Sequence, residues 1–513
     1  MPKVLGEVCG LLAALACGAL LPLTLAPYDW WPLGLVSIGG WFWLLNRRAA
    51  PAWALGLAYG LGKFGVGVSW VYVSIHGYGN ASPPLATLLV LIFVAGLSLF
   101  TLAHAQLYAW LRIEPAKAQP RGLAALGDAW LFAAIWVAFE WALTWFLTGF
   151  PWLYPGYGHL HTPLANLLPI GGVSLASLGI VVTACCLVCA LFDRHPPAIR
   201  AASAAIAATP WLIGLVLSTA QWVEPQATRS AALVQGNVDQ AVKWNRDSRM
   251  PIIDRYQDLT EPHWGRDLIL WPEAAITLFE HEAAPWLQRW GERGQASGTS
   301  LVLGVPSVEA AADGSHQFQN AAIAIGQGDG RYVKRRLVPF GDYVPLESTL
   351  RGLIAFFDLP MSRAAPGPWQ QPPLALGEDR AAMAICYEIA YANLTRNAAN
   401  QADLILTITN DTWFGRSIGP LQHLQIAQAR ALENGRWLLR AANNGVTAVI
   451  DHRGQVRERL RQFEPGVLLG DFQIMAGRTP YSRFGDGWLV AACLGSLLAF
   501  AWGARRKRGR EPS

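Results

Sequence analysis

The arrangement of apolar segments is the feature that most constrains how this chain of 513 residues can fold. A helix of about 20 mostly apolar residues is long enough to cross the hydrocarbon core of a bilayer. Seven apolar segments fill residues 1–222, and an eighth covers Trp488–Trp502. The seven lie at Val4–Ala26, Trp30–Leu45, Ala52–Ile75, Leu85–Leu111, Leu123–Leu147, Leu164–Leu191 and Ala201–Trp222. We therefore predict a polytopic α-helical membrane domain with eight spans.

The composition agrees with this interpretation. Only 15% of the residues are charged and 53% are hydrophobic, whereas a soluble globular protein carries roughly 25% charged residues. The net charge of +5 is small for this length, and the basic residues lie in loops and in the C-terminal tail rather than along one face. We therefore expect no nucleic acid among the partners.

A polar region separates the seventh span from the eighth. No segment within residues 223–487 is long enough to span a membrane, and apolar β-rich runs alternate there with helical patterns such as Leu421–Asn434. We expect residues 223–487 to form an inserted α/β sandwich domain, residues 1–222 the membrane domain, and residues 488–513 the last span with a basic tail. The expected strands are Ser230–Val234, Asp267–Trp271, Ser300–Val305, Ala321–Ile325, Ala381–Ile385, Leu404–Thr409 and Val446–Ile450.

The positions of lysine and arginine predict the orientation, because cytoplasmic loops are enriched in these residues. With eight spans, every basic cluster falls on one side, and loops such as His76–Pro84 and Gly149–Pro163 on the other side carry no Lys or Arg. We therefore expect both termini in the cytoplasm and residues 223–487 on the outer side. The basic positions include Lys3, Arg47, Arg48, Arg112, Lys117, Arg121, Arg194, Arg200, Arg505, Arg506, Lys507, Arg508 and Arg510.

Cys386 is the only one of the seven cysteines that lies outside a strongly apolar run of the membrane segments. It follows the expected strand Ala381–Ile385 and precedes an expected helix, and helix N–H groups at such a junction favour a thiolate. An unpaired cysteine in an oxidising compartment is a candidate nucleophile. A single cysteine is more commonly a buried core residue, so Cys386 alone does not decide between the two interpretations.

Glu273 and Lys334 shift the balance toward a catalytic site. Glu273 lies just past the expected strand Asp267–Trp271, where burial can bring a carboxyl pKa toward that of a working general base. In the alternative interpretation, Glu273 is a carboxylate at the N-terminus of a helix, where the helix dipole stabilises its charge. Lys334 can lower the pKa of a neighbouring thiol or stabilise an oxyanion. Its structural alternative is a solvated hairpin end, because Arg335 and Arg336 follow it directly.

A Glu, a Lys and a Cys at successive strand ends, in this order, resemble the nitrilase superfamily of carbon–nitrogen hydrolases. The longer motifs resemble its membrane-embedded branch, the apolipoprotein N-acyltransferase family, over nearly the whole chain. Two positions depart from the family pattern, since Asp342 replaces a usual Glu, and no Arg follows Glu140 and Trp141. The motifs are Val234–Asn237 with Trp244 beyond it, Trp271–Glu273, Lys334–Pro345, Cys386–Glu388, Asn410–Gly415 and Thr148–Trp152.

The resemblance implies an α-β-β-α catalytic sandwich and a two-step acyl transfer. Cys386 would attack the sn-1 ester of a phospholipid such as phosphatidylethanolamine, Glu273 would act as the base, and Lys334 would stabilise the oxyanion together with the backbone N–H of Tyr387. The thioester would pass its acyl chain to the α-amine of an N-terminal diacylglyceryl-cysteine of an apolipoprotein. The resemblance further implies no metal or other cofactor, and a monomer in the bacterial inner membrane with its catalytic domain in the periplasm.

Several residues are expected to support the reaction. Tyr387, Glu388 and Asp342 would lie beside the three catalytic residues. If acyl chains reach Cys386 through a lateral entrance, the segments Asn410–Arg416 and Phe340–Tyr343 would be mobile loops over it. Outward-facing aromatic residues form either an interfacial belt or a lateral entrance for acyl chains; these residues are Trp70, Tyr72, Tyr78, Trp152, Tyr154 and Tyr157. The residues expected to bind substrate are Trp244, Trp152, Tyr343, Trp413 and Phe414.

Other functions remain open at this stage. A membrane-tethered amidase would use the same three residues with water as the acceptor, a phospholipase would release the thioester to water, and a scaffold or transporter would carry an inactive nitrilase-like domain. The glycine-rich segment Gly60–Gly65 matches a dinucleotide fingerprint, but its place in a span favours helix packing through Gly56 and Gly60. His423 is interpreted as structural or channel-lining.

Overall fold

The computed structural model describes residues 2–112, 122–192, 195–310, 316–343 and 364–508. These residues form two compact units. The first comprises residues 1–71, 84–220 and 484–513, and the second comprises residues 72–83 and 221–483, each within the described ranges. The second unit thus includes a short segment from between two membrane helices as well as the polar region.

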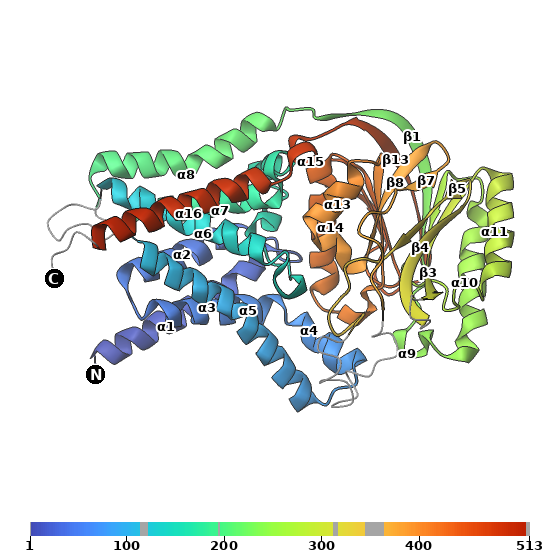
Figure 1. The fold of residues 1–513 in the computed structure, drawn as a ribbon, viewed down its shortest axis with the longest axis horizontal. Coiled ribbons are helices and arrows are strands. Elements are labelled where there is room, and N and C mark those ends of the chain that lie inside the picture. Colours follow the sequence, from blue (N-terminus) through green and yellow to red (C-terminus); the bar gives the residue numbers. More distant parts are fainter. Residues whose placement is uncertain (1, 113–121, 193–194, 311–315, 344–363, 509–513) are drawn as a thin grey trace. The chain divides into compact units, whose positions relative to one another are not determined.

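The first unit is built from helices (Figure 1). Within the described residues, six of them are long and apolar enough to cross a membrane. Two others, α2 and α3, have 16 residues each, which is roughly 24 Å at about 1.5 Å per residue and shorter than the ~30 Å bilayer core. The main helices are α1 (Pro2–Leu20), α2 (Pro32–Arg47), α3 (Ala52–Gly67), α5 (Pro83–Leu111), α6 (Gly122–Ala142), α7 (Leu168–Leu191), α8 (Pro197–Leu217) and α16 (Gly487–Arg508).

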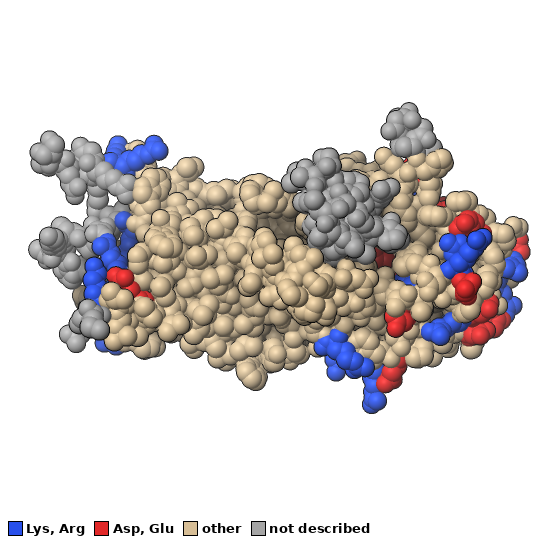
Figure 2. Space-filling view, turned by 90° about the horizontal axis from the view of Figure 1, so that it is seen from below, with Lys and Arg blue, Asp and Glu red and all other residues tan. Residues whose placement is uncertain are grey.

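The six candidate spans confirm the prediction of a membrane domain in part. The expected third span ends early, at Gly67, and the chain continues as a short helix α4 (Trp70–Val73) and a π-helical turn Ser74–Tyr78. The helices of the first unit present an uncharged surface over most of their length, with charged residues gathered at one end (Figure 2). Large apolar side chains of these helices, such as Leu91 and Val216, are exposed, as expected of helices that face lipid.

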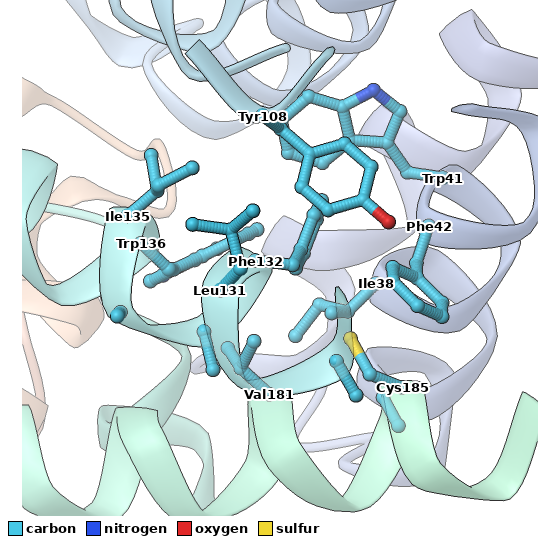
Figure 3. Packing of buried hydrophobic residues seen from close by; sticks show 14 of the residues in the cluster. Ile38, Trp41, Phe42, Tyr108, Leu131, Phe132, Ile135, Trp136, Val181 and Cys185 are labelled. Atoms are coloured by element: carbon cyan, nitrogen blue, oxygen red, sulfur yellow. The ribbon is translucent and has the colours of Figure 1, made fainter. Parts of the chain in front are cut away.

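The core of the first unit is rich in aromatic residues (Figure 3). The indole ring of Trp41 stacks on Tyr59 with ring centroids 4.1 Å apart. The ammonium of Lys63 lies 5.2 Å from the ring centroid of Trp136, and the Trp136 indole N–H donates to Glu140 at 2.8 Å. The family often has an Arg shortly after this glutamate, and this chain has none there. Glu140 instead accepts a hydrogen bond from Trp136, and the ammonium of Lys63 lies over the same indole ring.

Glycines let the helices of this core approach closely. A Cβ atom at Gly56 or Gly60 would clash with backbone or side-chain atoms of α5, which confirms the interpretation of this segment as a helix-packing surface. A Cβ at Gly62 would clash with the carbonyl oxygen of Leu15 in α1, whereas one at Gly65 would meet nothing within 4 Å. Small residues at such contacts are a common device of membrane helices.

This difference makes a matched pair of variants on one helix. We expect Gly62→Ala to lower the stability of the detergent-solubilised protein by about 1–3 kcal/mol, because the added methyl forces α1 and α3 apart. Gly65→Ala should leave stability unchanged or raise it slightly, because Ala favours helix over Gly. Thermal unfolding followed by circular dichroism measures both. Equal melting temperatures for the two variants would contradict the close α1–α3 contact.

The second unit contains two β-sheets that pack face to face. One sheet has the strand order β13-β1-β2-β3-β4-β6, and the other has the order β12-β11-β10-β9-β8-β7-β5. Parallel pairing joins β1, β2 and β3 in the first sheet and β8, β9 and β10 in the second. The strands are β1 (Val223–Gln235), β2 (Leu268–Leu270), β3 (Ser300–Ala310), β4 (His316–Gly326), β5 (Gly328–Asp329), β6 (Arg331–Val333), β7 (Leu374–Leu376), β8 (Asp379–Ile385), β9 (Leu404–Thr409), β10 (Leu438–Ala442), β11 (Ala448–Ile450), β12 (Val456–Arg459) and β13 (Gly466–Gly477).

Helices cover the outer face of each sheet (Figure 1). Helices α10 (Arg249–Thr260) and α11 (Ala284–Ser297) pack on the first sheet, and α13 (Ala392–Ala399) and α14 (Gly419–Asn434) pack on the second. Alternating residues of the strands divide between two cores, because successive side chains point to opposite faces. In β1, for example, Leu233 faces the other sheet and Val234 faces the helices. The expected α-β-β-α sandwich is therefore present.

Candidate active site

The candidate catalytic residues lie at strand ends of both sheets. Cys386 directly follows β8, Lys334 directly follows β6, and Glu273 comes shortly after β2. The carboxyl ends of parallel strands meet at one edge of a sheet, which is where open α/β sheets place their ligand sites. The two sheets thus bring these residues together from segments that are far apart in the sequence.

Glu273 is a buried carboxylate with three hydrogen-bond donors. Its Oε1 accepts from the Asn320 side-chain amide at 2.7 Å and from Lys334 Nζ at 3.2 Å. Its Oε2 accepts from the backbone N–H of Asn410 at 2.8 Å. Burial alone would raise the pKa of Glu273, but Lys334, these hydrogen bonds and the nearby Lys243 lower it below its usual value. Glu273 is therefore ionised at neutral pH.

Lys334 joins two carboxylates. Its Nζ lies 2.8 Å from Asp342 Oδ2 as well as 3.2 Å from Glu273 Oε1, and its side chain is only 2% exposed. Burial alone would lower the pKa of Lys334, but Asp342 first and then Glu273 hold it well above its usual range. The shorter side chain at position 342 reaches the lysine because the backbone closes a tight turn, in which Asp342 Oδ2 also accepts from the Val338 N–H.

Cys386 is held in a strained backbone conformation. Its φ of 56° lies in the left-handed region, which costs a non-glycine residue of the order of 1–3 kcal/mol and is found mostly at functional sites. The side chain keeps some exposure. Desolvation, and then the negative charge of Glu273, raise the pKa of the Cys386 thiol, while Lys334 opposes this shift. The resting site thus pairs a protonated thiol with an ionised carboxylate.

Glu388 ties the turn of Cys386 to the end of β6. Its two carboxylate oxygens accept from the backbone N–H groups of Arg335, Arg336 and Ile385 and from the Tyr332 hydroxyl. Glu388 is completely buried, and burial raises its pKa despite these donors. Its role is to hold two segments in place, because none of its oxygen atoms faces an open space.

Sequence reasoning did not find Lys243 or Asn320. Lys243 is 1% exposed, and its Nζ donates to the backbone carbonyl of Glu273 at 3.3 Å. Burial lowers the pKa of Lys243 to about 8, although Glu273 opposes the shift. The only available signal was the position of Lys243 beside Trp244. Among the described residues, no group of three or more His, Cys, Asp or Glu side chains is placed to hold a metal ion.

Comparisons with known proteins identify the relatives of this chain. Residues 17–186 match the family described as the apolipoprotein N-acyltransferase N-terminal domain, and residues 230–481 match the carbon–nitrogen hydrolase family. The chain is 45% identical to the apolipoprotein N-acyltransferase of Pseudomonas aeruginosa, over 98% of this chain and 97% of that protein. It is 39% identical to the apolipoprotein N-acyltransferase of Vibrio cholerae, over 97% of this chain and 98% of that protein.

The chain belongs to the apolipoprotein N-acyltransferase family. A relative in Azotobacter vinelandii that carries the same name is 46% identical over 98% of this chain and 96% of that protein. Among solved structures, an amidase of the nitrilase superfamily from Nesterenkonia AN1 is 21% identical, with a TM-score of 0.36, over 52% of this chain and 98% of that one.

The family motif Asn410–Gly415 is anchored rather than free. Asp411 and Thr412 are buried, so the expectation of a mobile loop is wrong for the first half of this segment. The carbonyl of Trp413 accepts from the Ser74 hydroxyl at 2.8 Å, and the Trp413 ring meets Tyr78 edge-on at 6.0 Å. The segment between α3 and α5 therefore supports this motif within the second unit.

The residues expected to bind substrate lie in different settings. Trp244 is half-buried beside Lys243, and its indole Nε1 has no hydrogen-bond partner among the described residues. Tyr343 is half-buried, and its carbonyl accepts from the Phe340 N–H at 2.7 Å. Phe414 packs edge-on against His423 with ring centroids 6.0 Å apart. Trp244, Tyr343 and Phe414 all belong to the second unit.

Four of the aromatic residues expected to form either an interfacial belt or a lateral entrance lie in the first unit and are buried there, which argues against a belt. Trp70, Trp152, Tyr154 and Tyr157 are all less than 10% exposed. Trp152 stacks on Phe150 and contacts Trp70. The four rings are buried in the first unit. The sequence pattern alone does not distinguish aromatic residues at a membrane interface from aromatic residues in a core.

The buried, fully hydrogen-bonded carboxylate of Glu388 predicts a loss of stability when it is replaced. We expect Glu388→Gln to lose about 1–3 kcal/mol of unfolding free energy, because the amide NH2 would face a donor N–H in either orientation. Glu378→Gln is the control, because Glu378 is exposed. Chemical denaturation of both variants measures the difference. Wild-type stability in Glu388→Gln would argue against the arrangement of four donors around this carboxylate.

Proposed function

We propose that this chain transfers a fatty acyl chain from a phospholipid to the α-amine of the N-terminal diacylglyceryl-cysteine of apolipoproteins. The names of relatives that match over nearly the whole chain support this reaction. The observation that carries the proposal is the ionised Glu273, paired with Lys334 at 3.2 Å, beside a thiol whose pKa both charges affect. A base, a cation and a nucleophile are the groups that acyl transfer through a thioester requires.

The first step would form the acyl-enzyme. Glu273 takes the thiol proton as Cys386 Sγ attacks the ester carbonyl, and Lys334 Nζ with the Tyr387 N–H stabilises the negative oxygen. The tetrahedral intermediate then expels the lysophospholipid alkoxide, which regains the proton from Glu273. Because the resting thiol is protonated, proton removal accompanies attack rather than preceding it.

The second step would run through the same groups in reverse. The α-amine attacks the thioester carbonyl, Glu273 accepts a proton from the amine, and the Cys386 thiolate leaves and is reprotonated. The product is an amide-linked acyl chain on the apolipoprotein. Trp244, Tyr343, Trp413 and Phe414 supply apolar surface near this site for the substrates, whereas Trp152 would act through the packing of the membrane unit.

We further propose eight membrane crossings in the bacterial inner membrane, with both termini in the cytoplasm and the catalytic domain in the periplasm, and a monomeric protein. Six helices of the described residues are long and apolar enough to cross, and the two short ones, α2 and α3, would cross with the help of local bilayer thinning. The one-sided distribution of Lys and Arg supports the orientation. The catalytic domain in this proposal is residues 223–487, together with the supporting segment 72–83.

Intact mass spectrometry tests the reaction. Wild-type protein incubated with phosphatidylethanolamine should gain the mass of one acyl chain, and Cys386→Ala should gain none. A synthetic diacylglyceryl-cysteine peptide should discharge the adduct and appear with an added acyl chain. Absence of an adduct on folded wild-type protein with several phospholipids would contradict the transferase, and discharge to water at the same rate as to the peptide would favour a phospholipase.

The buried Lys243 gives a prediction about pH. Replacing it with Met removes a charge that lowers the pKa of Glu273, so this pKa should rise, and the base should be lost at a higher pH. We therefore expect the acid limb of the acylation rate to shift to higher pH in Lys243→Met. Lys243 is charged in this range, because its own pKa is about 8. Lys243→Arg should keep the limb in place, and an unshifted limb in Lys243→Met would refute the electrostatic role.

A further inference from the structure

A buried histidine holds the peptide group that follows the nucleophile. His423, on α14, is completely buried, and its Nε2 lies 3.1 Å from the backbone carbonyl oxygen of Cys386. A carbonyl oxygen only accepts hydrogen bonds, so Nε2 must carry a proton and donate it. This contact links two segments 37 residues apart in the sequence.

The other ring nitrogen fixes the orientation of the histidine. Nδ1 lies 3.1 Å from Arg440 Nη2 and 3.0 Å from Asp411 Oδ1. Burial, and then the charge of Arg440, lower the pKa of His423, so the ring is neutral at pH 7. The Cys386 carbonyl requires the proton on Nε2, so the neutral ring accepts from Arg440 at Nδ1. Asp411 raises the pKa of His423 and opposes the shift, and with Nδ1 unprotonated it acts on the ring through Arg440 rather than by a hydrogen bond of its own.

Asp411 neutralises the arginine in turn. Its Oδ2 lies 2.6 Å from Arg440 Nη2, and both side chains are fully buried. The Thr409 hydroxyl donates to Asp411 Oδ1 at 2.8 Å. A Cβ at Gly445 would clash with the Asp411 carboxylate, so the chain leaves room for it there. The buried arginine, aspartate and histidine thus form one rigid polar network beneath the nucleophile.

The held carbonyl belongs to the same peptide unit as the Tyr387 N–H. A peptide group is planar, and in its trans form the C=O and N–H bonds point in opposite directions. A donor that fixes the Cys386 carbonyl on one side therefore fixes the direction of the Tyr387 N–H on the other. The unusual φ of Cys386, 56°, makes such a hold necessary, because the local chain does not favour this conformation.

We propose that His423, oriented by Arg440 and Asp411, is a positioning residue that aims the Tyr387 N–H at the developing oxyanion. This inference rests on the proposed function, in which that N–H stabilises the tetrahedral intermediate. The same network reaches the base, because Asn410, the neighbour of Asp411, donates its backbone N–H to Glu273. One dipeptide, Asn410-Asp411, thereby fixes the base directly and the oxyanion donor through His423.

Three substitutions at one position separate the contacts of His423. Gln places an amide nitrogen as many bonds from the backbone as Nε2, so His423→Gln keeps the donor to Cys386. Asn reaches only the place of Nδ1, so His423→Asn loses that donor. His423→Phe keeps the ring that packs against Phe414 and removes both nitrogens.

Two reactions of Cys386 are measured for each full-length variant, together with its melting temperature. Thioester formation from phosphatidylethanolamine builds a negative oxygen, whereas alkylation of the thiol by iodoacetamide does not. We expect His423→Asn and His423→Phe to slow thioester formation roughly 10- to 100-fold while alkylation changes by less than about threefold. His423→Gln should recover most of the thioester rate.

The outcomes distinguish the two proposals. Equal slowing of alkylation and thioester formation in His423→Phe, in proportion to lost folded protein, would reduce His423 to a structural role. Thioester formation at the wild-type rate in His423→Asn and His423→Phe would overturn the positioning role and leave the acyltransferase intact. If the wild-type protein itself forms no thioester but is alkylated normally, the proposed function fails, and the oxyanion role fails with it.

Discussion

The buried ion pair of Glu273 and Lys334 is the interaction on which the rest of the catalytic unit depends. Two charges lose their hydration when they are buried, and they remain charged only if other groups replace the water. Here Asp342 forms a second ion pair with Lys334, while the Asn320 side chain and the Asn410 N–H donate hydrogen bonds to Glu273. The result is an ionised Glu273 beside a protonated Cys386 thiol.

This charge arrangement in turn requires two facing sheets. Glu273, Lys334 and Asn320 come from the first sheet, while Cys386 and Asn410 come from the second. A single sheet would place such residues along one edge, whereas the sandwich places them opposite each other. Glu388 links the two sheets near the site, because it accepts hydrogen bonds from the backbone after β6 and from the backbone before Cys386.

Short apolar runs allow the strands before Glu273 and Cys386 to be predicted, because both residues come just after such a run. No such run was expected before Lys334, since β6 has only three residues, and the family resemblance was needed to single this lysine out. Lys243 and His423 could not be predicted, since each acts on a backbone carbonyl of a residue 30 or more positions away and no local pattern reports such a contact. The end of α3 was also beyond a hydropathy argument, because it depends on a turn at Val68, whereas α2 has the 16 residues of the expected segment, shifted by two positions. The burial of Trp152 could not be predicted either, because an aromatic residue in an apolar run fits a core as well as a membrane interface.

The segment between α3 and α5 belongs to the same compact unit as the polar region. Ser74 and Tyr78 contact Trp413, and Val73 leaves little space beside Gly415, whose φ of 52° belongs to the left-handed region. These contacts brace the motif whose first residue, Asn410, donates to the base. A fragment limited to residues 223–487 would keep every catalytic side chain but lose this brace. The position of Glu273 therefore depends in part on residues 72–83, which lie between α3 and α5 in the chain and belong to the second unit.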